Sequence, residues 1–79
     1  MTDQEKRDLH RRIATVLVDQ KTFLGWSNEN VANEAGLATW TVQRMMSGEG
    51  CRVATLANVI GVLGLSLTDF FEMVEKETT

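Results

Sequence analysis

The chain has 79 residues, which is enough for one small domain with a modest hydrophobic core. Hydrophobic residues make up 43% and charged residues 24%, the balance of an ordinary globular protein, and no apolar run is long enough to span a bilayer. A single Cys excludes an intrachain disulfide, and one Cys with one His excludes the usual zinc sites. We therefore expect one cytoplasmic domain over residues 1–79, without a membrane segment, a metal or another cofactor.

The charges are unevenly distributed along the chain. The net charge of −3 argues against nucleic acid when it is taken alone. However, Lys76 is the only basic residue after Arg52, and acidic residues crowd the terminal segment from about 72 to 79. A basic surface beside an acidic end can still bind phosphate locally. The alternative is that these charges only solvate the surface.

A capping box and an apolar repeat predict the first helix. Thr2 followed by Glu5 is the capping-box pattern. The apolar residues that follow recur at helical spacing: Leu9, Ile13, Val16 and Leu17. We expect this helix to run from about Asp3 to Lys21, with Gly25 as a left-handed cap beyond it.

Two short helices are predicted next. Ser27 is a good N-cap residue, and Trp26 before it pairs with Val31 as a hydrophobic staple. Gly36 is expected to end this helix in a tight turn. A third helix is expected from about residue 39 to residue 46, because it is bounded by that turn and by Ser47-Gly48.

Two more helices complete the predicted all-α fold. The fourth is expected from about residue 53 to 63, and the fifth from a cap at Ser66 to about residue 75, with residues 76–79 frayed. Their expected apolar sets are Val53, Leu56, Val59, Ile60 and Leu63, and then Leu67, Phe70, Phe71 and Val74. No period-two strand pattern and no internal repeat is present.

Two short helices joined by a tight, glycine-containing turn describe a helix-turn-helix over about residues 27–47. The wider segment 26–71 resembles the lambda-repressor-like (XRE/Cro) helix-turn-helix family. The residues that carry this resemblance are Ser27 to Ala32, Ala35-Gly36-Leu37, Val42, Arg44, Ser47-Gly48, Val53, Thr55-Leu56-Ala57, Leu63 to Leu67 and Asp69-Phe70-Phe71. The resemblance implies a five-helix DNA-binding domain with the third helix in the major groove.

Three positions depart from that family's usual pattern. Asn28 stands where the family often has Gln, although its amide can still donate to a phosphate. Trp40 stands where a polar residue is usual. Glu49 follows the third helix where Lys or Arg is common, and a carboxylate close to the DNA backbone weakens binding.

Helical geometry predicts which side of the third helix faces outward. Steps of about 100° place Trp40, Gln43, Arg44 and Ser47 on one face, opposite the expected core residues Val42 and Met45. Arg44 can reach guanine O6 and N7, and Gln43 can reach adenine N6 and N7. The expected base contacts are Thr39, Trp40, Gln43 and Arg44, and the expected DNA-backbone contacts are Ser27, Asn28, Thr41, Ser47 and Arg52. The alternative is that Trp40 folds back against Met46 or the following loop as an additional core residue.

The last helix carries more apolar surface than one core needs. We expect a homodimer through Phe70, Phe71, Met73 and Val74. The alternative is that Phe70 and Val74 complete the core while the other two pack at its edge. Two protomers would read half-sites about one helical turn apart.

No catalytic constellation is present, and we expect no enzyme. His10 is expected to be solvated on the outside of the first helix, and Cys51 is expected to be an ordinary loop thiol. The sequence therefore predicts a small transcriptional regulator, a repressor of phage or mobile-element type, that binds double-stranded DNA. Two alternatives remain open: an antitoxin-type autorepressor that also binds a toxin, and a module that binds a protein partner through the surface around Trp40.

Overall fold

The computed structural model describes residues 1–77, which form five α-helices and no strand. The helices are α1 (Asp3–Leu24), α2 (Asn28–Ala35), α3 (Thr39–Met46), α4 (Val53–Val62) and α5 (Leu67–Lys76). The predicted all-α, five-helix class is confirmed. Residues 78 and 79, the end of the expected acidic, frayed segment, lie outside the described residues.

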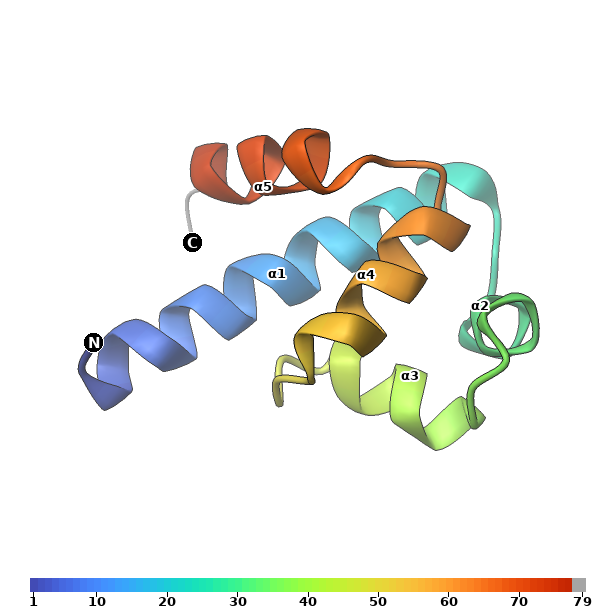
Figure 1. Ribbon diagram of the computed structural model, residues 1–79, viewed down its shortest axis with the longest axis horizontal. Coiled ribbons are helices and arrows are strands. Elements are labelled where there is room, and N and C mark those ends of the chain that lie inside the picture. The colour runs from blue at the N-terminus through green and yellow to red at the C-terminus, as the bar shows by residue number, and fades with distance from the viewer. Residues whose placement is uncertain (78–79) are drawn as a thin grey trace.

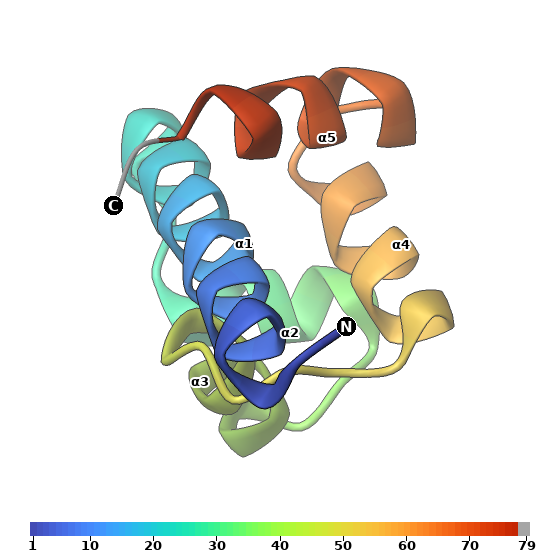
Figure 2. The ribbon, with the colours of Figure 1, turned by 90° about the vertical axis from the view of Figure 1, so that its left-hand side faces the viewer.

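The helices surround one core (Figure 1). The long α1 crosses the molecule and contacts α3 and α5, α2 packs against α3 and α4, and α4 contacts α5. After a turn of 90°, α5 lies across the top of the molecule above α1 and α4, and α2 and α3 lie below them (Figure 2). Every helix contributes at least one fully buried side chain, and the largest in each helix are Leu17, Val31, Val42, Ile60 and Phe70.

Four helices end in the same glycine turn, in which a backbone amide donates to the carbonyl oxygen five residues earlier in the chain. The four bonds join Trp26 to Lys21, Leu37 to Ala32, Glu49 to Arg44 and Leu65 to Ile60, with N–O distances of 2.9–3.2 Å. The turn at Gly36, with φ of 69°, needs the left-handed region that glycine adopts freely. After three of these turns the donor residue is apolar and packs against the core. After α3 it is Glu49, and this exception shapes the candidate site.

The start of α1 is closed by the predicted capping box. The Glu5 amide donates to Thr2 Oγ1 at 3.1 Å, and the Thr2 amide donates to Glu5 Oε1 at 3.0 Å. The bond from the Thr2 amide, helped by the Thr2 side chain, lowers the pKa of Glu5. Because the pKa is lowered in the folded state, this contribution to stability is present above the ordinary Glu pKa and is lost as pH falls through the lowered value.

Two side-chain amides tie distant helices together. Gln20 Nε2 donates to the Leu63 carbonyl at 3.2 Å and so joins α1 to the end of α4. Asn58 Nδ2 donates to the Ala35 carbonyl at 2.8 Å and so joins α4 to the end of α2. The second bond satisfies a terminal carbonyl of α2 and holds the turn before α3 in place.

Three expectations about the elements need correction. The α1 helix continues to Leu24, three residues beyond the predicted end, because the Gly25 turn caps the helix there. Val53 is 80% exposed rather than part of the core, and it occupies the first position of α4. Leu67 opens α5 in the same way and is 49% exposed.

Among residues 1–77, no single helix is long and apolar enough to cross a membrane, although α4 and α5, bent by 98° at their junction, pass that test as a pair by length and composition alone.

Ser27→Ala is expected to destabilise the domain by about 1 kcal/mol. Ser27 Oγ accepts the Asn30 amide at 3.1 Å and donates to Asn30 Oδ1 at 2.9 Å, and the substitution removes both of these bonds. The reciprocal bond from the Ser27 backbone amide to Asn30 Oδ1, at 3.0 Å, remains. Urea unfolding measures the change. Ser47→Ala is the matched control, because that hydroxyl only donates back to the Gln43 carbonyl within α3. An equal cost for the two variants would contradict the assignment of Ser27 as a cap.

Candidate nucleic-acid interface

The outer face of α3 presents a row of polar and aromatic side chains. Trp40 is 60% exposed, and Gln43, Arg44 and Ser47 are also exposed. Val42 is fully buried behind them, as is Met45 at 3% exposure. The predicted outward face of α3 is confirmed, and Trp40 does not fold back against the core. An anchored helix with an exposed Trp beside an Arg is a surface suited to contact another molecule.

Arg44 lies between an aromatic ring and a carboxylate. Its Cζ is 5.7 Å from the centroid of the Trp40 ring, and its Nε is 3.4 Å from Glu49 Oε1. The glycine turn after α3 causes the second contact, because the Glu49 amide donates to the Arg44 carbonyl at 3.2 Å. Both charged side chains are more than half exposed, so water screens the pair and a stronger partner can displace Glu49.

A groove of about 580 Å³ separates α3 from the start of α4. It brings together Trp40, Thr41 and Arg44 from α3 with Arg52 from the residue before α4. Thr55, in the first turn of α4, also lines the groove. Sequence reasoning did not select Thr55 as a site residue, because its place beside α3 depends on packing between two helices.

The start of α2 is less available to a phosphate than the sequence suggested. The Ser27 hydroxyl is occupied in both directions by Asn30. Asn28 is half-buried, and its Oδ1 is buried without a hydrogen-bond partner among the described residues. Neither Ser27 nor Asn28 lines the groove beside α3. What remains at this end of α2 is the free backbone N–H groups of its first turn.

The starts of α3 and α4 have more unused donors. Their N-cap residues are Ala38 and Arg52, and neither makes a side-chain cap bond. Of the remaining predicted contacts, Thr39 and Thr41 are half-buried at the start of α3. The first turn of α4, with the exposed Arg52 before it, therefore offers backbone N–H groups and a guanidinium to the same groove.

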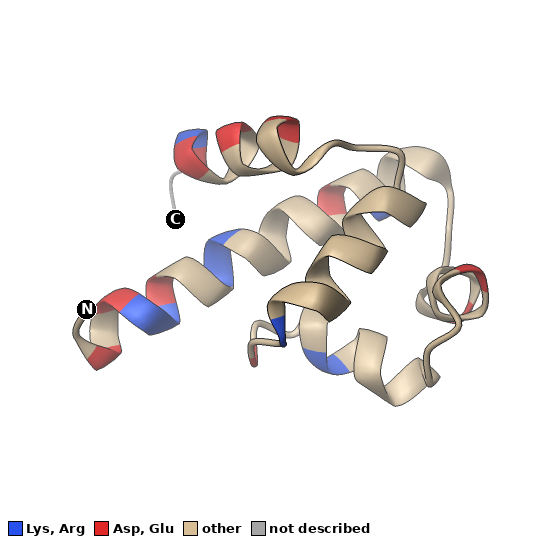
Figure 3. Ribbon diagram, viewed as in Figure 1, with Lys and Arg blue, Asp and Glu red and all other residues tan. Residues whose placement is uncertain are grey.

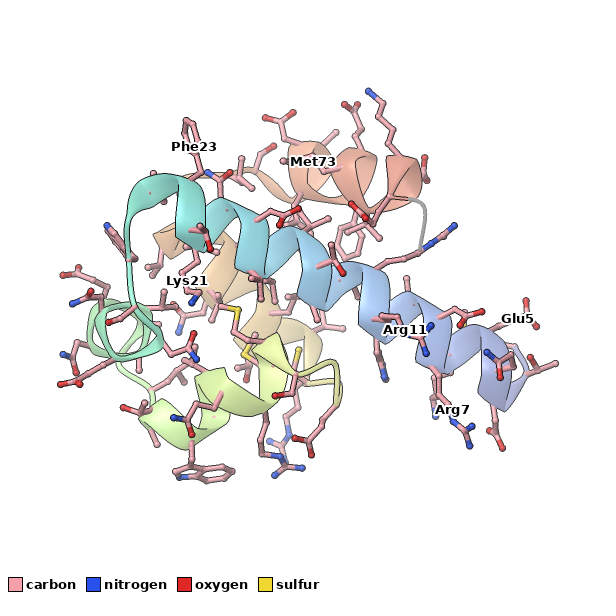
Figure 4. All side chains as sticks on the ribbon, turned by 180° about the vertical axis from the view of Figure 1, so that it is seen from behind. Glu5, Arg7, Arg11, Lys21, Phe23 and Met73 are labelled. Carbon is pink, nitrogen blue, oxygen red and sulfur yellow. The ribbon has the colours of Figure 1, made fainter. Side chains whose placement is uncertain are left out.

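Basic and acidic residues are mixed on the side of the molecule that carries α3, whereas α5 is mostly acidic. Figure 3 shows basic segments on α1, on α3 and at the start of α4, with acidic segments on α1, on α2 and in the loop after α3, while α5 on the opposite edge is mostly acidic. Arg7 projects from α1 toward the α3 side in Figure 4. Arg11 also lies next to the end of α3, because its Cα is 3.7 Å from where a Cβ on Gly48 would stand. Its ion pair with Asp8, at 3.9 Å, is exposed and weak.

His10 is not solvated on the helix exterior as the sequence suggested. It is half-buried, and a Cβ on Gly50 would stand only 2.6 Å from its Cε1 atom. The loop after α3 therefore lies directly over the imidazole. Cys51 follows in the same loop and is exposed, but partial desolvation still raises the pKa of its thiol. A raised pKa favours the neutral thiol, which is a poor nucleophile.

Alkylation of Cys51 by iodoacetamide at pH 8 is expected to be slower in the folded protein than in urea-unfolded protein, since partial desolvation reduces the thiolate fraction. Because the pKa of the folded thiol is raised, its alkylation rate should still increase with pH in the range where the rate for the unfolded protein is already constant. Mass spectrometry of timed samples measures both rates on the one thiol. Equal rates in the two states would show that the thiol is not desolvated.

The predicted dimer contact on α5 needs correction. Phe70 is fully buried and Val74 is 2% exposed, because both face the core from successive turns of α5. Phe71 and Met73 are each 38% exposed. They lie on opposite flanks of the buried stripe, with Asp69, Glu72 and Glu75 on the outer face between them. Like charges on that face oppose its pairing with a second copy.

Within residues 1–77, no three His, Cys, Asp or Glu side chains lie close enough to hold a metal ion. Comparison with protein-family models, with curated proteins and with solved structures finds no match to this chain.

Proposed function

We propose that this protein binds double-stranded DNA in a sequence-specific way, as a small transcriptional repressor whose α3 lies in the major groove. The observation that carries the proposal is the exposed row Trp40, Gln43 and Arg44 on a short helix that Val42 and Met45 anchor from behind. A major groove about 12 Å wide admits one helix presented in this way. The resemblance to the lambda-repressor-like family favours the same function.

Each side chain has a distinct role in the proposed complex. Arg44 reads guanine through its two-pronged guanidinium, and Gln43 reads adenine through its amide. Trp40 packs on a thymine methyl group or along the sugar wall. Thr39 and Thr41 place hydroxyls near the groove edge. Phosphates are held by Arg52 and Ser47, by the first turn of α4, and by the free amides at the start of α2.

The charge pattern sets the expected strength of binding. Phosphate neutralisation supplies much of the affinity for DNA, and this acidic chain has few cations on the α3 side. The outer face of α5 does not favour a preformed dimer. We therefore propose that two protomers meet on DNA, at half-sites about one helical turn apart.

Selection of bound duplexes from a random DNA library tests the function. The proposal expects a two-fold symmetric motif, recovered at about 50 mM salt and lost as salt rises, since each phosphate contact releases counterions. The control is Trp40→Ala with Gln43→Ala and Arg44→Ala, a triple variant in which only exposed side chains change. If the folded wild type yields no motif at low salt, the DNA proposal is wrong.

Glu49→Gln is expected to raise DNA affinity by a few fold at low salt. The substitution removes a carboxylate that holds Arg44 at 3.4 Å and that would face the phosphates. Stability should change little, because the pair is exposed. Fluorescence anisotropy of a labelled operator measures the gain, which should shrink as salt rises. Glu72→Gln on α5 makes the same charge change away from α3. A gain of the same size from Glu72→Gln would leave no specific role for Glu49.

A protein partner is the second candidate, and the Arg44–Glu49 contact favours it. That contact neutralises the main base-reading side chain and leaves a large aromatic ring exposed beside it. Exposed Trp and Arg side chains are typical centres of protein interfaces. Under this alternative Trp40→Ala abolishes partner binding, while DNA is not bound at any salt concentration.

A further inference from the structure

A second, apolar pocket lies on the other side of α3 from its exposed face with Trp40 and Arg44. It has a volume of about 210 Å³ and lies between α1, α4 and α5, whose relative positions Figure 2 shows. Ile13 of α1, Leu56 of α4 and Phe71 of α5 form its apolar walls, and Met45 of α3 also lines it. His10 and Cys51 are the polar side chains that line it.

The size of the pocket limits what can occupy it. A cavity of about 150 Å³ lined by apolar side chains holds benzene, whereas drug-sized ligands need about 300–1,000 Å³. A volume of about 210 Å³ therefore fits one substituted ring. A second copy of the chain is a poor occupant, because a stable interface buries about 800 Å² on each partner and the outer face of α5 is acidic.

The chemistry of the walls selects the kind of ring. No Lys, Arg, Asp or Glu side chain lines the pocket within the described residues, so a charged ligand would lose its hydration without a counter-charge. Phe71 can pair with an aromatic ring, and the Met45 sulfur favours aromatic contacts. The His10 imidazole can exchange one hydrogen bond, and the Gly50 backbone above it fixes its position.

We propose that this pocket binds a small, neutral, monocyclic aromatic molecule with one hydroxyl group, its ring against Ile13, Met45 and Phe71 and its hydroxyl on His10. Met45 and Cys51 also line the groove beside Trp40 and Arg44. An occupant therefore touches the back of α3 and the loop that carries Glu49. A regulatory effect on DNA binding rests on the proposed function, whereas the binding site itself does not.

Phenol is the probe, and amide chemical shifts of ¹⁵N-labelled protein are the measurement. The proposal expects saturable shifts at Ile13, Met45 and Cys51, with half-saturation at roughly 1 mM for a ligand of this size. Cyclohexanol should bind several times more weakly, because it lacks the aromatic face. Shifts that grow linearly to about 20 mM, or equal binding of cyclohexanol, would overturn the proposal.

Leu9→Trp fills the pocket from its α1 wall and should raise the half-saturation concentration at least tenfold. Leu24→Trp places the same side chain on the exposed end of α1 and should leave binding unchanged. Unchanged binding in a folded Leu9→Trp protein would overturn the site.

A measurement on the wild type alone keeps the test independent of variant folding. Phenol at about ten times its half-saturation concentration should slow alkylation of Cys51 severalfold, since the thiol lines the pocket. No protection would overturn the proposal. Slower alkylation on concentrating the protein without phenol would also overturn it, in favour of a second copy. Because no DNA is present, failure here is distinct from failure of the DNA proposal.

Discussion

Arg44→Ala is expected to weaken binding to the selected operator by roughly 10- to 100-fold and to remove the preference at one base pair. A good bidentate contact to a base contributes about 1–3 kcal/mol of discrimination. Part of this loss is offset, because wild-type Arg44 must first leave Glu49, 3.4 Å from its Nε, before it can reach a base. Trp40 also loses the guanidinium that lies 5.7 Å from its ring. Binding to unrelated DNA should fall much less.

Two further variants separate the geometry of Arg44 from its charge. Arg44→Lys keeps the positive charge but loses the planar fork, so it should retain non-specific binding while losing base preference. Lys76→Ala removes the same charge from the end of α5, on the opposite edge of the molecule (Figure 3). Fluorescence anisotropy titrations at two salt concentrations measure the DNA affinity of Arg44→Ala, Arg44→Lys and Lys76→Ala. If Lys76→Ala and Arg44→Ala weaken binding equally, Arg44 contributes only net charge.

The helices were predictable because their start and stop signals are local. Ser27 before α2, the glycine after each of the first three helices and the 100° step along α3 each act within a few residues. The bounds of α3 and its outward face therefore agree with the sequence-based prediction. The end of α1 was predicted too early, because Phe23 and Leu24 are exposed yet remain helical up to the Gly25 turn.

The parts of the site that the sequence did not predict depend on contacts between distant residues. His10 and Gly50 are forty positions apart, yet the loop lies on the imidazole. Nothing in the pattern around Thr55 indicates that it shares a groove with Trp40. The Arg44–Glu49 pair spans only five residues, but it depends on the glycine turn after α3 rather than on helical spacing.

The same limit explains the error on α5. Phe70 and Phe71 are adjacent and chemically identical, and both fit the apolar pattern of that helix. Phe70 is buried and Phe71 is exposed because α1 and α4 cover only one side of α5. An apolar residue in excess of the core is a local observation, whereas the direction of the core is set by the whole fold. The four residues predicted as a dimer surface therefore include two that complete the core.

Phe70→Ala is expected to destabilise the domain by about 3–5 kcal/mol. The ring is fully buried, and removing it leaves a cavity among α1, α4 and α5 that so small a core cannot close. A chain of this length has a total stability of roughly 4–12 kcal/mol, so the variant should be largely unfolded at modest urea concentration. Urea unfolding followed by circular dichroism measures the change.

Phe71→Ala is the matched control, with an expected cost of about 1–2 kcal/mol because its ring is already 38% exposed. The two rings form one edge-to-face pair with centroids 5.2 Å apart, so each variant loses that pair once. The difference between the two costs therefore reports burial and not the aromatic contact. Equal costs would mean that something covers Phe71 in solution. That result would favour either a dimer through this flank of α5 or an occupied pocket beneath it, and repeating the measurement over a range of protein concentrations would separate the two.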